Sequence, residues 1–175
     1  MTGPVVFIAG SPSPVSRSSL VAQAVADALA AEGLDAKAFS LRDFDAADVL
    51  FARTSAPAIA SFVDAAKTAT AIVLSTPVYK ATYAGGLKAL VDLIPPEALV
   101  GKPALGIATT RLPEHGVSVH LGYAGLFDFF RARALDSLVV LDSQFEGEGA
   151  SLTLGAAARE RARAAARSLQ VALTA

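Results

Sequence analysis

Residues 5–19 of the chain read VVFIAGSPSPVSRSS. The apolar run Val5–Ala9 is typical of a buried strand, and it stops at Gly10. From Ser18 onward apolar residues recur at helical spacing, so the intervening polar residues form a loop that leads from a strand into a helix. The first N–H groups of a helix lack partners within it and carry partial positive charge, which favours a phosphate at this junction. The candidate donors to that phosphate are the hydroxyls of Ser11, Ser16, Ser18 and Ser19 and the guanidinium of Arg17.

The same loop also suits an ordinary helix start, in which the serines only cap the helix and Arg17 is solvated. It contains neither the G-x-G-x-x-G pattern of dinucleotide sites nor the G-x-x-x-x-G-K-[ST] pattern of the P-loop. The sequence therefore leaves a mononucleotide cradle of another type as the functional alternative.

Composition excludes several classes of function. The chain has 175 residues, 53% of them hydrophobic, which predicts a single globular domain over residues 1–175. No apolar stretch is long enough to span a membrane, so we expect a cytoplasmic protein. A net charge of −1 offers no basic surface for nucleic acid. With no cysteine and only 2 histidines, the sequence argues against thiolate catalysis, disulfides and a metal site.

Strand and helix patterns alternate five times along the chain. After Val5–Ala9, strands are expected at 36–41, 71–75, 103–108 and 134–141, and helices at 19–32, 57–67, 87–94, 117–131 and 156–173. Residues 42–55 are expected as a polar connection. This alternation predicts an α/β fold with a parallel sheet and helices on both faces. Ligands of such sheets bind beyond the carboxyl ends of the strands, where the loops 10–19, 76–86 and 109–116 should meet.

Two motifs resemble a known family. GSPSPVSRSS at 10–19 is followed about sixty residues later by STPVYKATYAGGLKALVDLIP at 75–95. This pair resembles the NADPH-dependent FMN reductases of the flavodoxin-like proteins, especially those that supply reduced flavin to alkanesulfonate monooxygenases. The resemblance extends from about Val5 to Leu141. It implies a flavodoxin-like three-layer sandwich with a five-stranded parallel sheet in the order 2-1-3-4-5.

The resemblance also assigns roles to two loops. The first loop, with the five donors named above, would hold the FMN phosphate. The second would follow the ribityl chain and the isoalloxazine ring with Pro77, Val78, Tyr79 and Lys80. A flavin needs an apolar wall and backbone donors near its pyrimidine edge, and this loop offers both. The alternative is that Tyr79 and Tyr83 are ordinary half-buried aromatics.

The third loop departs from the family pattern. Family members commonly have two glycines after the fourth strand, whereas this chain reads ATTRLPEHGVS at 108–118. Thr109 would begin this wall of the site. Arg111 or His115 could donate to the flavin or to the coenzyme phosphates, and the alternative is a solvated loop.

One helix suggests contact between subunits. In the sulfonate-type reductases a tyrosine forms a one-residue π-bulge at a tetramer interface near the flavin, and the resemblance aligns Tyr123 with it. Phe127, Phe129 and Phe130 follow closely and exceed what one inner helix face needs. We therefore expect a homo-oligomer, either a dimer or a tetramer.

The predicted function is hydride transfer from NADPH or NADH to FMN, with reduced FMN passed to a flavin-dependent monooxygenase. Such transfer depends on positioning the two rings and requires no catalytic acid or base. Three alternatives remain: a quinone or azo reductase that retains FMN, a non-enzymatic flavodoxin-like electron carrier, and an interaction domain that has lost its cofactor. The near-neutral charge opposes the carrier, because carriers that dock on basic partners are usually acidic.

Overall fold

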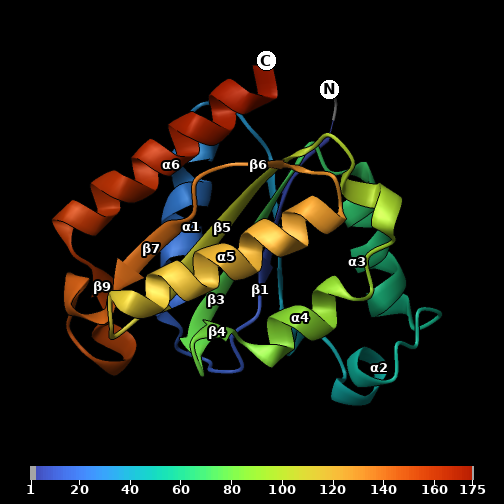
Figure 1. The fold of residues 1–175 in the computed structure, drawn as a ribbon, viewed down its shortest axis with the longest axis horizontal. Coiled ribbons are helices and arrows are strands. Elements are labelled where there is room, and N and C mark those ends of the chain that lie inside the picture. Colours follow the sequence, from blue (N-terminus) through green and yellow to red (C-terminus); the bar gives the residue numbers. More distant parts are fainter. Residues whose placement is uncertain (1–2, 175) are drawn as a thin grey trace.

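A parallel sheet with helices on both faces forms the centre of the molecule (Figure 1). The computed structural model describes residues 3–174. The strand order is β2-β1-β3-β5, with β6 and β7 both pairing with β5 and the short β4 pairing antiparallel with β3. The strands of this sheet are β1 (Val5–Ala9), β2 (Ala36–Ser40), β3 (Ala71–Tyr79), β4 (Thr82–Tyr83), β5 (Pro103–Thr110), β6 (Arg133–Ala134) and β7 (Leu138–Leu141). The fold class and the order of the main strands are those that the sequence predicted.

The helices divide between the two faces of the sheet (Figure 1). Helices α1 and α6 cover one face, and α3, α4 and α5 cover the other. The α-helices are α1 (Arg17–Ala30), α2 (Ala46–Leu50), α3 (Pro57–Thr68), α4 (Gly85–Val91), α5 (Glu114–Phe129) and α6 (Ala156–Thr174). A separate antiparallel pair, β8 (Phe145–Glu146) and β9 (Thr153–Leu154), lies between β7 and α6 in the chain. None of the helices in residues 3–174 is long and apolar enough to cross a membrane.

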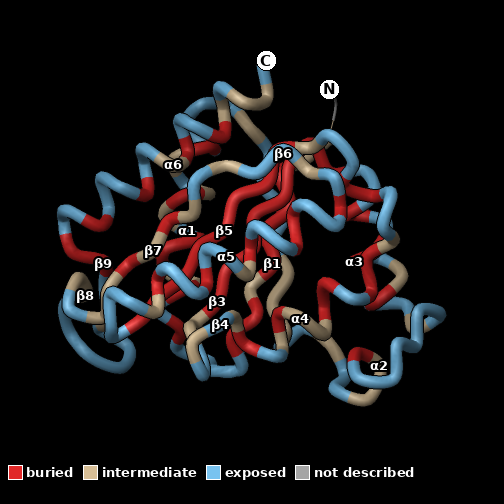
Figure 2. Tube along the Cα trace, viewed as in Figure 1, coloured by how far each residue is buried: buried red, intermediate tan, exposed pale blue. Residues whose placement is uncertain are grey.

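Alternating side chains of the strands supply both halves of the core. In β1, Val5 and Phe7 pack with α1 and α6, whereas Val6 and Ile8 pack with α3 and α4. Strand β5 is buried along its whole length, as expected for a central parallel strand covered on both faces. Figure 2 shows the consequence, with buried strands inside and exposed helix faces outside.

Several boundaries differ from the prediction by one to three residues: α1, expected at 19–32, spans Arg17–Ala30, and α4, expected at 87–94, spans Gly85–Val91. Three other differences affect the last strand, α5 and the connection 42–55. The last strand, expected at 134–141, is split into β6 and β7, and residues 135–137 between them are not part of a strand. Helix α5 begins at Glu114, three residues early, since Pro113 has helical dihedral angles (φ −55°, ψ −38°). The connection 42–55 contains a 3₁₀ turn and α2, which Asp45 caps by accepting hydrogen bonds from the N–H groups of Ala47 and Asp48.

A fourth difference changes the shape of the site. The segment 76–86 was expected as a loop, but β3 continues through it to Tyr79 and pairs with β4 in a hairpin. The two turn residues, Lys80 and Ala81, have φ angles of 52° and 64°. Such turns usually carry Asn-Gly, so the residue types of Lys80 and Ala81 do not predict this turn.

Candidate functional site

The three loops predicted to meet do meet, around a cavity of about 400 Å³ beyond the carboxyl ends of β1, β3 and β5. The end of β7 completes its wall. The cavity is lined by Ser11, Ser13, Val15, Ser16, Arg17, Pro77, Val78, Tyr79, Thr109, Thr110, Arg111 and Asp142. This volume is within the range of small-molecule and cofactor sites in proteins.

Gly10 allows the first loop to leave the sheet. Its N–H donates to the carbonyl of Ser75 on β3 at 2.9 Å. A Cβ atom at this position would lie 2.3 Å from the Cβ of Leu87 on α4. Because no other residue fits so close an approach, the path of the loop into α1 depends on glycine here.

The hydroxyls of this loop surround the start of α1. Ser16 is the N-cap residue, and its Oγ accepts the N–H of Ser19 at 3.3 Å and lies 3.0 Å from Oγ of Ser18. Ser11 is almost fully buried in the cavity wall. The first turn of α1 contains no acidic residue, so its N–H groups and positive dipole end face no carboxylate of their own helix. This is a suitable donor set for a phosphate.

Arg17 is held from one side by the segment after β7. Its Nε lies 3.9 Å from Oδ1 of Asp142, and its guanidinium carbon lies 5.8 Å from the centre of the Phe145 ring. The Arg17 side chain is 43% exposed, so it faces both this segment and solvent. Sequence reasoning identified Arg17 but gave no sign of its acidic neighbour.

The hairpin forms the second wall. Oγ1 of Thr76 accepts the N–H of Ala84 at 2.8 Å and donates to the carbonyl of Pro77 at 2.9 Å, which ties the base of the hairpin together. Pro77, Val78 and Tyr79 then line the cavity, and Tyr79 remains 48% exposed. An apolar and aromatic surface therefore stands opposite the serine cradle.

The third wall is made by the end of β5. Thr109 and Thr110 are buried, and Oγ1 of Thr110 accepts the N–H of Leu112 at 3.3 Å and donates to its carbonyl at 3.2 Å. This local turn presents the exposed Arg111 to the cavity. Thr110 thus closes the turn at the end of β5.

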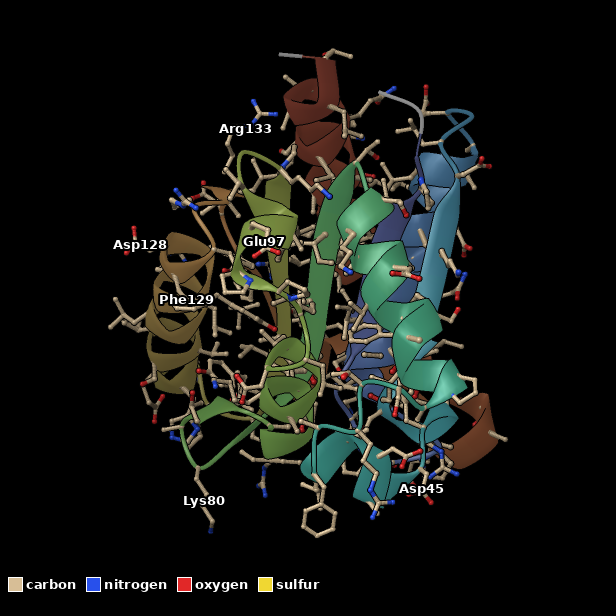
Figure 3. All side chains as sticks on the ribbon, turned by 90° about the vertical axis from the view of Figure 1, so that its right-hand side faces the viewer. Asp45, Lys80, Glu97, Asp128, Phe129 and Arg133 are labelled. Carbon is tan, nitrogen blue, oxygen red and sulfur yellow. The ribbon has the colours of Figure 1, made fainter. Side chains whose placement is uncertain are left out.

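Four predicted residues do not line the cavity. Ser18 is fully buried and contacts Ser16, while Ser19 lines a second cavity between α1 and β2. Lys80 is at the exposed tip of the hairpin and extends away from the body of the molecule (Figure 3). His115 lies in the first turn of α5. Conversely, the sequence analysis missed Ser13, Val15, Thr110 and Asp142.

Tyr123 is a core residue, and its assignment to a π-bulge at an interface is wrong for this structure. Helix α5 is α-helical from Glu114 to Phe129, and Tyr123 is fully buried. Its hydroxyl donates to the carbonyls of Ile107 at 2.7 Å and Leu74 at 3.2 Å, and burial raises the pKa of the phenol well above its usual value. The ring packs on Gly106, where a Cβ atom would lie 2.3 Å from it. Because Gly106 on β5 has no side chain, it leaves room for the ring of Tyr123 in the core.

Two of the three phenylalanines that follow Tyr123 also lie in the core. Phe127 and Phe130 are buried, and only Phe129 is exposed, at 64%. The exposed face of α5 is nevertheless apolar, because Val117 and Leu121 are each 65% exposed and precede Phe129 at helical spacing.

Comparison with known proteins agrees with this geometry. Residues 4–147 match the profile of the family described as NADPH-dependent FMN reductase. The chain belongs to this family. It is 37% identical to FMN reductase (NADPH) of Pseudomonas putida over 141 residues, which are 80% of this chain and 72% of that protein. It is 35% identical to FMN reductase (NADPH) of Escherichia coli over 133 residues, covering 75% and 69% of the two chains. The protein is thus an oxidoreductase of the class that uses FMN and NADPH.

Solved structures resemble the fold of this enzyme. An NADH:FMN oxidoreductase in its apo form superposes with a TM-score of 0.84 at 28% identity, covering 97% of this chain and 89% of that one. A flavodoxin from an archaeon superposes with a TM-score of 0.67 at 12% identity, covering 99% and 100%. The second likeness concerns the fold alone and supports the flavodoxin-like architecture.

The chemistry of the cavity fits FMN, which combines a phosphate, a ribityl chain and a flat ring, and which supplies the redox chemistry when bound. Hydroxyls, helix N–H groups and Arg17 at one end match a phosphate. The apolar hairpin wall at the other end, formed by Pro77, Val78 and Tyr79, matches an aromatic ring. The two ends of the cavity therefore match the two ends of the cofactor.

Proposed function

We propose that this enzyme reduces FMN with a hydride from NADPH and releases reduced FMN to a separate flavin-dependent monooxygenase of the sulfonate-assimilation type. The observation that carries the proposal is the cavity itself, with a phosphate cradle on α1 and a half-exposed ring wall on the hairpin. A further relative, the NADH-dependent FMN reductase SfnF of Pseudomonas putida, is 29% identical over 75% of this chain and 73% of that protein. NADH is therefore the second coenzyme to test.

In this proposal the residues of the chain bind and orient. The start of α1 and Arg17 hold the phosphate, and the hairpin residues from Pro77 to Tyr79 hold the ring. Arg111 lines the same cavity from the third wall, and in this proposal it contacts the coenzyme. With both cofactors bound, hydride transfer would depend on how these residues position the two rings, and no side chain would need to exchange a proton.

The first experiment follows NADPH oxidation by protein stripped of flavin, with and without added FMN. We expect oxidation that saturates with FMN and continues for many turnovers. Bound FMN without NADPH oxidation would instead support the electron carrier. A protein that binds no FMN would refute the proposal.

The second experiment tests release. After reduction by NADPH without oxygen, the mixture is passed through a membrane that retains the protein, and the flavin in the filtrate is measured. We expect reduced FMN in the filtrate. Reduced flavin that stays with the protein would favour the alternative of an FMN-retaining quinone or azo reductase.

We also propose a homo-oligomer formed through the exposed face of α5. Val117, Leu121 and Phe129 lie there at spacings of four and eight residues, and large apolar side chains exposed together on one helix are typical of a protein interface. Next to it, a groove of about 630 Å³ runs between α5 and β7.

Leu121→Glu should convert the oligomer to monomers in analytical ultracentrifugation, because it places a charge in the interface. Exposed Leu50, on α2 and away from this face, offers a control in Leu50→Glu, and dissociation by both variants or by neither would contradict the proposal.

A further inference from the structure

A carboxylate lies in the same cavity as the residues that match the phosphate. Asp142 lines the cavity, and its Oδ1 is 3.9 Å from Nε of Arg17. The charged side chains of the lining are Arg17, Arg111 and Asp142, so one of two positive charges is balanced and the net formal charge is +1. A site that only had to retain an anion would gain from the absence of this carboxylate.

The backbone around Asp142 is fixed by its own contacts. Leu141 pairs with Thr110 of β5, which is itself part of the cavity wall. The N–H of Leu141 donates to Oε1 of Gln144 at 3.0 Å, and the carbonyl of Gln144 accepts the N–H of Gly155 at 2.9 Å. The backbone that carries Asp142 is therefore held at the wall by the fold.

Asp142 makes no hydrogen bond to Arg17. At 3.9 Å the two side chains attract each other but do not form a hydrogen bond. The ring of Phe145, in the same segment, already lies beneath the guanidinium. This arrangement leaves the donors of Arg17 available to an incoming anion, which would share the cation with a fixed negative charge.

We propose that Asp142 competes with the FMN phosphate for Arg17 and thereby keeps FMN exchangeable. The inference rests on the proposed function, in which FMN binds with its phosphate at the start of α1. The phosphate and Asp142 compete for the one charge of Arg17, so binding of the phosphate weakens the attraction between Arg17 and Asp142, which is restored when FMN leaves. In this way one residue sets the lifetime of the complex in an enzyme that has to hand its flavin on.

The test compares FMN with riboflavin, which has the same ring and ribityl chain but no phosphate. Asp142→Asn removes the charge and keeps the shape of the side chain. We expect it to tighten FMN binding about ten-fold, measured by fluorescence quenching on flavin-free protein, and to slow FMN dissociation in stopped flow by a similar factor. Riboflavin binding should not change. Asp64→Asn is the matched control, because Asp64 is an exposed carboxylate on α3 that lies 3.7 Å from Lys67, outside the cavity.

A double variant shows whether the effect of Asp142 on FMN affinity depends on Arg17. In an Arg17→Ala background, Asp142→Asn should change FMN affinity by less than about three-fold, because there is no cation left to share. Weaker or unchanged FMN binding by Asp142→Asn alone would overturn the inference and make Asp142 a residue that positions Arg17 or only supports the fold. Absence of FMN binding by the unmodified protein would overturn the proposed function itself, so the two failures are distinguishable.

Discussion

The strand-to-helix loop at 10–16 and the β3–β4 hairpin form opposite walls of one cavity, but different forces hold them in place. The loop is held in place by the close contact of Gly10 with Leu87 on α4 and by the hydroxyl of Ser16, which caps α1. The hairpin packs on the core through Val78 and Tyr83, but its tip is free of the core: the two turn residues have positive φ, and Tyr79 beside them is half exposed. We infer that the phosphate end of the site is preformed, whereas the ring end is strained and more adaptable.

The largest expected effect is the loss of stability when the loop at 10–16 is disturbed. Gly10→Ala should lower the free energy of unfolding by about 3 kcal/mol, because its Cβ atom would overlap the backbone and Cβ of Leu87. Urea denaturation measures this loss. Gly85→Ala is the control, since a Cβ atom there meets open space and should change stability by less than about 1 kcal/mol. Equal stability of the two variants would show that the loop is not held as described.

The second-largest effect distinguishes contacts with the FMN phosphate from contacts with the flavin ring. Arg17→Ala should weaken FMN binding by about 1.5–3 kcal/mol, the usual contribution of a hydrogen bond to a charged group, and should leave riboflavin binding unchanged. Titration of flavin-free protein with both ligands measures the difference. Arg53→Ala is a suitable control, because Arg53 is an exposed arginine paired with Asp48 outside the cavity. An equal loss for FMN and riboflavin would remove Arg17 from the phosphate end.

The hairpin should show the opposite pattern. Tyr79→Ala should weaken FMN and riboflavin equally, by about 1 kcal/mol, because the lost contact is with the ring that both ligands share. The same titrations measure it. A loss confined to FMN would place Tyr79 at the phosphate and reverse our orientation of the cofactor in the cavity.

The smallest effect concerns strain in the turn. Ala81→Gly should raise the free energy of unfolding by about 0.5 kcal/mol, because glycine adopts the left-handed region without a Cβ penalty. Ala89→Gly, within α4, should instead lower it by about 1 kcal/mol. If Ala81→Gly destabilises the protein as much as Ala89→Gly, the hairpin is not strained.

The strand-to-helix loop at 10–16 could be predicted from the sequence because the residues that define it are neighbours in the chain. An apolar run, a glycine, serines and an arginine within fifteen residues are enough to place a strand, a tight loop and a capped helix. The sheet class followed in the same way, from apolar runs such as 71–75 that alternate with helical spacing. Each of these features depends on neighbours in the chain, so local patterns reveal it.

The remaining features depend on contacts between distant residues. Asp142 reaches Arg17 only because β7 lies beside β5 in the sheet, and nothing near Asp142 in the sequence indicates a phosphate site. Tyr123 turned inward because Gly106, on a different element, leaves room for its ring. The hairpin was missed for a local reason, since Lys80 and Ala81 adopt a turn that their residue types do not favour.

The most direct test of the account is a crystal structure of the enzyme with FMN. The account predicts that the phosphate lies within hydrogen-bonding distance of the N–H groups at the start of α1 and of the Arg17 guanidinium, with the isoalloxazine ring against Tyr79. A phosphate bound elsewhere, such as at Arg42 in the second cavity between α1 and β2, would contradict the assignment of the site.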